Sequence, residues 1–146
     1  MQLELALSLP RDGRSVPVAR HVVRAGLRTS GVDEDCVHDI EVALSEACTN
    51  VLEHGDPAAE YELRLHLDQD RCVLRIVEVG RGLASTFEQA LPSGAPEDEV
   101  EHGRGLLLMR ALVDRVGFRP LSGSGSGSVL SLEKRLTYAD PEPSSK

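Results

Sequence analysis

The sequence has few aromatic residues and a deficit of positive charge. Aromatic side chains make up 3% of its 146 residues, and Trp is absent. Proteins that bind single-stranded nucleic acid stack the bases on aromatic side chains, so this class is disfavoured. Lys and Arg number 16 against 24 Asp and Glu, which gives a formal net charge of −8. Nucleic-acid binding driven by charge alone is therefore not expected.

Cysteine motifs and long apolar runs are also lacking. The three cysteines, Cys36, Cys48 and Cys72, are odd in number and form no Cys-x-x-Cys pair. We interpret them as small buried apolar side chains in a reducing compartment. No apolar run approaches the roughly 20 residues that span a bilayer, and residues 1–9 lack the basic start of a signal peptide. These features predict a cytoplasmic protein without membrane contact.

The length and the apolar content favour one compact domain. A chain of 146 residues, 40% of them hydrophobic, can bury a substantial core. We expect this domain to occupy residues 1–137. The last residues, 138–146, include two Pro and two Ser, and we expect them to form a disordered tail.

Three periodic segments occupy the first part of the chain. Apolar and polar residues alternate over Leu3–Leu9, which predicts a half-buried strand. Ser15 is a candidate cap for a helix that ends near Gly31, with periodic positions at Val18, His21, Val22, Ala25 and Leu27. A second helix is expected from a cap at Asp33 to Gly55. Its apolar stripe consists of Val37, Ile40, Leu44, Ala47, Cys48 and Val51.

The rest of the chain predicts strands around a long irregular segment. Alternation over residues 61–67 and a second run over 72–79 indicate an antiparallel hairpin. Patterning is lost over residues 80–105, and loops of this length are usually functional or disordered. A third helix is expected over residues 106–116 and a last strand over 129–135, within the order β-α-α-β-β-loop-α-β-β. This order predicts a two-layer α/β sandwich, in which a mostly antiparallel, mixed sheet carries helices on one face.

A first candidate cluster lies on the second expected helix. Glu46 and Asn50 are four residues apart, so they lie about 40° from each other at the edge of the apolar stripe. A carboxylate can serve as a base, and a carboxamide oxygen is a hard ligand suited to Mg²⁺. The alternative is a solvated helix edge with a local hydrogen bond.

A second cluster is the segment Glu78-Val79-Gly80-Arg81-Gly82. Glu78 continues the row of side chains that Cys72, Leu74 and Ile76 place on one face of their strand. An inward carboxylate needs a donor, because an unpaired buried charge is costly. Either the amino group of a purine or an arginine of the protein would supply one. A plain turn at the end of the strand is the alternative.

A third cluster, Gly103-Arg104-Gly105-Leu106, opens the third expected helix. Free N–H groups and the positive end of the helix dipole make such a terminus a potential phosphate site. The guanidinium of Arg104 would add a cation. Because many helices begin after glycine, this cluster alone does not establish phosphate binding.

In this order, the three clusters resemble the nucleotide site of the GHKL (histidine-kinase-like) ATPase superfamily, which has the Bergerat fold. The segment from Asp39 to Asn50, which ends in Ser-Glu-Ala-Cys-Thr-Asn and is followed by His54 and Gly55, resembles the bacterial anti-sigma factor serine/threonine kinases. The likeness covers approximately residues 3–136. It implies that the whole domain has this fold.

The resemblance implies ATP and Mg²⁺ as cofactors. By this resemblance, Glu46 would be the catalytic base, Asn50 would hold Mg²⁺ against the phosphates, and Glu78 would receive the adenine amino group. The lid over the nucleotide would be residues 83–102. The other implied nucleotide contacts are Gly80, Gly82, Gly103, Arg104, Gly105 and Leu106.

Glu78 departs from the family pattern, which has Asp at this position. The additional methylene moves the carboxylate by about 1.5 Å, and displacements of about 1 Å in a positioned site can cost a hundredfold in rate. Two hypotheses follow. The chain is an ATP-dependent serine/threonine kinase that binds a sigma factor and phosphorylates an anti-sigma antagonist protein. Alternatively, it is a catalytically inactive, nucleotide-independent anti-sigma or interaction module of the same fold.

The family likeness and one arginine-rich helix face suggest how this protein contacts its partners. The family likeness suggests a homodimer, a sigma factor and an antagonist protein as partners, with no direct nucleic-acid or membrane contact. Arg20, Arg24 and Arg28 repeat every four residues and would form one face of the first helix. This face is a candidate partner surface, although such stripes are commonly solvated.

Overall fold

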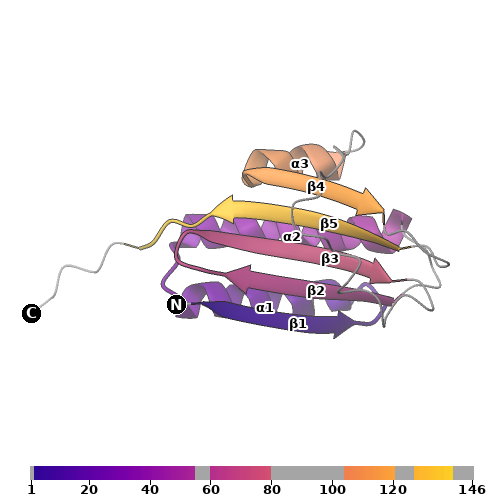
Figure 1. Ribbon diagram of the computed structural model, residues 1–146, viewed down its shortest axis with the longest axis horizontal. Coiled ribbons are helices and arrows are strands. Elements are labelled where there is room, and N and C mark those ends of the chain that lie inside the picture. The colour runs from indigo at the N-terminus through magenta and orange to yellow at the C-terminus, as the bar shows by residue number, and fades with distance from the viewer. Residues whose placement is uncertain (1, 55–59, 80–103, 121–126, 140–146) are drawn as a thin grey trace, which may run out of the picture.

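A computed structural model describes residues 2–54, 60–79, 104–120 and 127–139 of the chain. Five strands form one sheet, and every strand pair is antiparallel. The strands are β1 (Leu3–Leu9), β2 (Glu60–Leu67), β3 (Arg71–Val79), β4 (Arg115–Pro120) and β5 (Gly127–Arg135), in the spatial order β1-β2-β3-β5-β4. The helices are α1 (Ser15–Thr29), α2 (Glu34–His54) and α3 (Arg104–Leu112). All three lie on the same side of the sheet (Figure 1).

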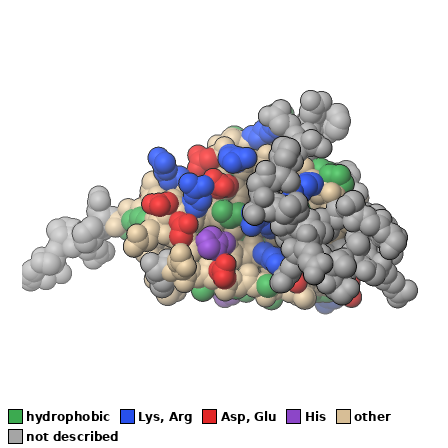
Figure 2. Space-filling view, in the orientation of Figure 1, with side chains coloured by type: hydrophobic (Ala, Val, Ile, Leu, Met, Phe, Trp, Pro, Cys, Tyr) green, Lys and Arg blue, Asp and Glu red, His purple; other side chains and the backbone are tan. Residues whose placement is uncertain are grey.

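The two layers confirm the predicted architecture, with one difference. The sequence predicted a mostly antiparallel, mixed sheet, and in the described sheet all pairs are antiparallel. The core lies between the sheet and the helices, where the inward row of β2 (Tyr61, Leu63, Leu65 and Leu67) meets the apolar stripe of α2. The open face instead carries interspersed charged side chains (Figure 2), among them the ion pair between Arg64 Nε and Glu62 Oε1 at 2.6 Å.

The helix α2 follows its sequence pattern closely. All six residues of its predicted stripe are buried. Asp33 caps the helix as expected, since its Oδ1 accepts a hydrogen bond from the backbone N–H of Cys36 at 2.8 Å. This long, well-fixed helix packs against both α3 and β3. It therefore provides a rigid support for side chains at its edge.

The helix α1 has the predicted ends but a different buried face. Its buried residues are Ser15, Ala19, Val23 and Leu27, whereas Val18 is 51% exposed. Ser15 was expected to cap the helix, but the cap position is Arg14 and no side chain caps it. The Ser15 hydroxyl is instead hydrogen-bonded to the hydroxyl of Tyr61 in the core. Of the predicted positions only Leu27 is fully buried, and the small residues Ser15 and Ala19 occupy buried positions in the first half of the helix.

The third helix is shorter than predicted. It ends at Leu112, and residues 115 and 116, which were expected to be helical, begin the edge strand β4. Lys134 Nζ on β5 donates to the carbonyl oxygen of Leu112 at 2.8 Å, and so satisfies one of the carbonyl groups at the end of the helix. The β-branched residues at positions 113 and 116 suit either structure, so pairing with β5 decides where the strand begins.

The cysteines and the last described residues complete the fold. All three cysteines are free and buried, as the sequence predicted, and burial raises the pKa of the Cys48 thiol to about 12. Tyr138 Oη donates to the carbonyl oxygen of Gln69 at 2.9 Å. The backbone N–H of Ala139 donates to Gly31 O at 3.1 Å, so residues 138 and 139, which were expected to belong to the tail, are hydrogen-bonded to the rest of the fold. Residues 140–146 of the predicted tail lie outside the described ranges.

Candidate functional site

Glu46 and Asn50 project from consecutive turns of α2, and both are half-buried. Neither side chain forms a hydrogen bond or ion pair with another residue in the described ranges. A carboxylate and a carboxamide at the edge of a core helix would normally be satisfied by neighbouring side chains or by solvent. Their polar atoms are therefore available to a ligand, which fits the base and Mg²⁺-binding roles that the family likeness implies.

The start of α3 lies directly against Glu46. A Cβ atom built at Gly105 would be 3.6 Å from Glu46 Oε1, so the carboxylate lies next to the position that a side chain at Gly105 would occupy. The next residue, Leu106, is 5% exposed and packs in the core. It fixes the first turn of α3 against α2, and the N–H groups of that turn are the ones that a helix leaves without partners. The predicted base and the predicted phosphate-binding terminus are thus brought together.

Glu78 is joined to the same region by an arginine. It lies at the end of β3 with its carboxylate turned inward, and the residue is 5% exposed. Arg11 Nη1 is 3.0 Å from Glu78 Oε2, and Arg11 Nη2 donates to the carbonyl oxygen of Val51 at 2.7 Å. Because both nitrogens belong to one guanidinium group, Glu78 lies close to the turn of α2 that contains Asn50.

Arg11 was not predicted from the sequence to be part of this site. The sequence did require a donor for an inward Glu78 and allowed an arginine of the protein as one. The signal that points to Arg11 is the strand register, in which Leu9 pairs with Tyr61 and Tyr61 pairs with Glu78. Arg11 follows Leu9 by two positions. It therefore lies in the turn after β1, within reach of Glu78.

Several predicted contacts fall outside the described residues. Gly80, Gly82, Gly103 and the lid over residues 83–102 are among these, and so is the side chain of Arg104, although its backbone belongs to α3. The described ranges contain no group of three or more His, Cys, Asp or Glu side chains that could hold a metal ion by themselves. No helix in them is long and apolar enough to cross a membrane.

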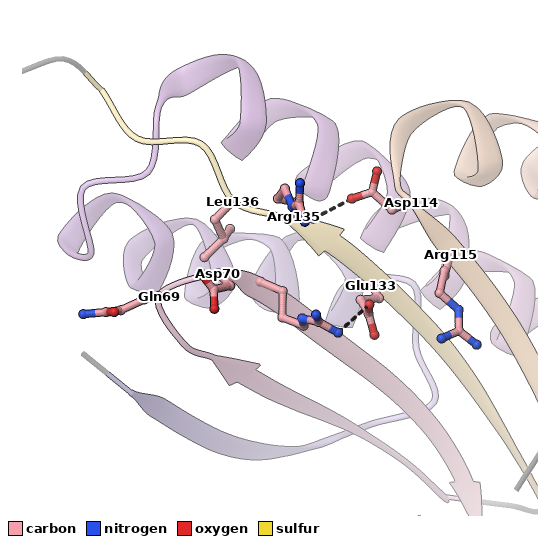
Figure 3. Close-up of a pocket in the computed structure, with 8 residues that line it drawn as sticks. Gln69, Asp70, Asp114, Arg115, Glu133, Arg135 and Leu136 are labelled. Atoms are coloured by element: carbon pink, nitrogen blue, oxygen red, sulfur yellow. Dashed lines mark hydrogen bonds and ion pairs between the residues drawn. The ribbon is translucent and has the colours of Figure 1, made fainter. Parts of the chain in front are cut away.

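A separate depression lies at the end of the sheet that is remote from Glu78 (Figure 3). Its rim includes Arg71 at the start of β3, about 23 Å along the strand from Glu78 at the usual rise per residue. Charges of opposite sign face each other across it, and Arg71 Nη1 is 3.0 Å from Glu133 Oε2. None of the residues predicted for nucleotide binding lines this depression.

The arginine stripe of α1 is engaged within the protein. Arg24 Nε donates to Glu41 Oε1 at 2.7 Å, and Arg28 Nη2 donates to Glu34 Oε1 at 2.6 Å. Both carboxylates belong to α2. Arg24 and Arg28 therefore connect α1 with α2, and the Arg28–Glu34 pair is exposed to solvent. That this stripe forms a partner surface stays a prediction.

Comparison with known proteins decides the family. Residues 9–134 match the histidine kinase-like ATPase domain. The chain belongs to this family. It is 30% identical over 138 residues to the serine-protein kinase RsbW of Halalkalibacterium halodurans, a match that covers 90% of this chain and 83% of that protein. It is 28% identical to RsbW of Bacillus subtilis, over 82% of this chain and 79% of that protein. These matches confirm the resemblance inferred from the sequence.

Two solved structures are similar to this chain in fold. The RsbU and RsbW domains of Rv1364c from Mycobacterium tuberculosis give a TM-score of 0.66 at 21% identity, over 94% of this chain and 33% of that chain. The SiaB–SiaC complex from Pseudomonas aeruginosa gives 0.62 at 13% identity, over 90% of this chain and 89% of that one. At these identities, the matches support the histidine-kinase-like fold.

Proposed function

We propose that this protein is an ATP- and Mg²⁺-dependent serine/threonine kinase that binds a sigma factor and phosphorylates an anti-sigma antagonist protein. The observation that carries the proposal is the contact between the Glu46 carboxylate and the start of α3 at Gly105, with Asn50 on the next turn of α2. The similarity to RsbW serine-protein kinases supports the reaction class. The partners rest on the family resemblance.

These residues match the requirements of phosphoryl transfer. Asn50 would be the protein ligand of Mg²⁺, which usually keeps several waters and binds substrate phosphates as well. The N–H groups at the start of α3 would bind phosphate oxygens. Glu46 would orient the acceptor hydroxyl and take its proton while the hydroxyl oxygen attacks the γ-phosphorus. The bond to the bridging oxygen breaks, and ADP leaves.

Calorimetric titration with ATP and ADP, each with Mg²⁺, tests the nucleotide site. We expect micromolar binding by the unmodified protein and a loss of at least tenfold in Asn50→Ala. Asp35→Asn, an exposed change at the start of α2, is the matched control and should bind normally. No binding of either nucleotide would contradict the proposal.

Transfer to a protein is tested with ATP labelled on its γ-phosphate. Incubation with soluble proteins of the source cell should give an acid-stable label on a small protein, as expected for phosphoserine or phosphothreonine. The label should disappear with Glu46→Gln and persist with Asp35→Asn. A label that forms equally well with Glu46→Gln would rule out the assigned base.

One observation favours the nucleotide-independent alternative. Glu78, which would receive the adenine amino group, already accepts a hydrogen bond from Arg11 in the protein itself. If the protein acted by contact alone, the titrations would show no nucleotide binding in the unmodified chain. Binding restored by Glu78→Asp would then indicate that the longer side chain had abolished an ancestral site.

A further inference from the structure

The carboxylate of Glu78 is a buried charge with a defined partner. Its side chain is 7% exposed and that of Arg11 is 16% exposed, so neither group is fully hydrated. A buried carboxylate without a partner is strongly destabilising. Arg11 supplies the compensating charge through Nη1, at 3.0 Å from Glu78 Oε2. A neutral purine amino group could not supply that charge, so the ion pair is what permits an inward acid here.

Arg11 is itself held in place. Its second terminal nitrogen donates to Val51 O on α2 at 2.7 Å. The guanidinium thus connects the turn after β1 with both α2 and β3. The planar fork of an arginine loses little further freedom when two of its donors are fixed in this way, so it can orient a carboxylate as well as neutralise it.

The other neighbours of Glu78 leave one carboxylate oxygen unused. Tyr61, its partner across the strand pair, is hydrogen-bonded through its hydroxyl to Ser15. Within the described ranges, the only hydrogen bond to the Glu78 side chain is the one that Arg11 donates to Oε2. An ionised carboxylate can accept about four hydrogen bonds. Oε1 therefore retains its capacity to accept.

We propose that Arg11 is a positioning residue that holds Glu78 so that Oε1 accepts the exocyclic amino group of a 6-aminopurine, and that this pair sets the preference for 6-amino over 6-oxo purines. The inference rests on the proposed nucleotide site and adds to it the residue that determines base selection. A 6-oxo purine presents an acceptor to the same carboxylate, and two facing acceptors leave a buried polar group unpaired.

The test compares ATP with inosine triphosphate, in which oxygen replaces the amino group. Calorimetric titrations with Mg²⁺ should show that the unmodified protein binds ATP at least tenfold more tightly. In Arg11→Met, which keeps an unbranched side chain but removes the charge and donors, the ratio should fall below threefold. Arg11→Lys should recover part of the ratio, because an ammonium group can still pair with Glu78. Arg14→Met, at a side chain that is 91% exposed, is the matched control and should leave the ratio at the unmodified level.

A second variant keeps the test valid if Arg11→Met does not fold. Arg11→Met/Glu78→Gln removes both charges, and its carboxamide can donate or accept, so it should bind the two nucleotides within threefold of each other. Circular dichroism confirms that each variant is folded. A ratio that stays at the unmodified level in folded Arg11→Met or in the double variant would overturn the inference.

The outcomes separate this inference from the proposed function. Absence of ATP binding by the unmodified protein would overturn both. Binding of ATP without preference over inosine triphosphate would leave the nucleotide site standing and overturn the role of the Arg11–Glu78 pair. Tighter ATP binding by Arg11→Met at an unchanged ratio would mean that the guanidinium obstructs the base pocket, which also contradicts the inference.

Discussion

Gly105 occupies a helical position where its backbone does not require glycine. In the described part of the chain, only Gly31 has a positive φ, at 86°. A Cβ at Gly105 would meet Glu46 Oε1 at 3.6 Å, which is an ordinary van der Waals distance. The absence of a side chain is thus not demanded by helix geometry. It leaves open the surface of the carboxylate that we assign as the base.

Gly105→Ala should therefore separate stability from activity. Alanine favours the helix over glycine, so the free energy of unfolding should rise by up to about 1 kcal/mol. The added methyl group would narrow the space beside the Glu46 carboxylate and slow phosphoryl transfer by about tenfold or more. Thermal unfolding and the rate of label transfer measure the two effects. Gly13→Ala is the control for the effect of replacing a glycine by alanine, because a Cβ at Gly13 would meet no atom within 4 Å. Full activity in Gly105→Ala would argue against the assigned site.

At the scale of elements, the sequence predicted correctly those helices and strands whose apolar residues recur with a regular period. The stripe of α2 and the β2–β3 hairpin were identified correctly because apolar side chains there have one consistent period and one buried face. The buried face of α1 was predicted wrongly except at Leu27, because Ser15 and Ala19 are too small or too polar to mark a core position in a sequence. The boundary between α3 and β4 depends on pairing with β5, which no local pattern contains.

The pairing of α1 with α2 can be tested through Arg24. Glu41 is 9% exposed and receives two hydrogen bonds from the Arg24 guanidinium. Arg24→Met would leave this carboxylate without its cation, and we expect a loss of about 2 kcal/mol in the free energy of unfolding. Arg20→Met, on the same stripe, should change stability by less than about 0.5 kcal/mol. Chemical denaturation measures both; equal effects would mean that the Arg24–Glu41 pair does not stabilise the helix packing.

At the scale of the whole molecule, the site is assembled from segments far apart in the sequence. Glu46 and Asn50 could be predicted together because one helix carries them, and Glu78 because its strand alternates. The contact between Glu46 and Gly105 crosses from α2 to α3, and the family likeness was needed to expect it. Arg11 could not be assigned, since its contacts with Glu78 and Val51 depend on the register of three strands and on the placement of α2.

Carboxylates at the turns between elements make the stability of the fold sensitive to acid. The Arg14 side chain and backbone N–H lower the pKa of Asp12 from 3.8 to about 2. A hydrogen bond from Thr137, together with the N–H of Cys36, lowers the pKa of Asp33. Backbone N–H groups of Asp70 and Arg71 lower the pKa of Asp68 in the β2–β3 turn. Each of these ionised carboxylates accepts hydrogen bonds at a junction between two secondary-structure elements, and so holds the chain there.

The direction of the pH effect follows from these lowered pKa values. A carboxyl group with a lower pKa in the folded state stabilises the fold above its unfolded pKa, which is near 3.8 for these aspartates. That contribution is lost as the pH falls through the folded pKa, which is about 2 for Asp12. The melting temperature should therefore be steady above pH 5 and fall between pH 4 and about pH 2.

The variant Asp33→Asn/Asp68→Asn identifies the groups responsible. Asn keeps an acceptor but not the charge, so at pH 6 the variant should melt below the unmodified protein. As the pH falls below the unfolded pKa of 3.8 and through the lowered pKa values of the folded state, the native carboxyl groups become protonated and the two melting temperatures should converge. Asp70→Asn is the control, since the Asp70 side chain has no hydrogen-bond partner within the described ranges. A difference that persists undiminished at pH 2 would show that the charges of Asp33 and Asp68 do not hold these turns.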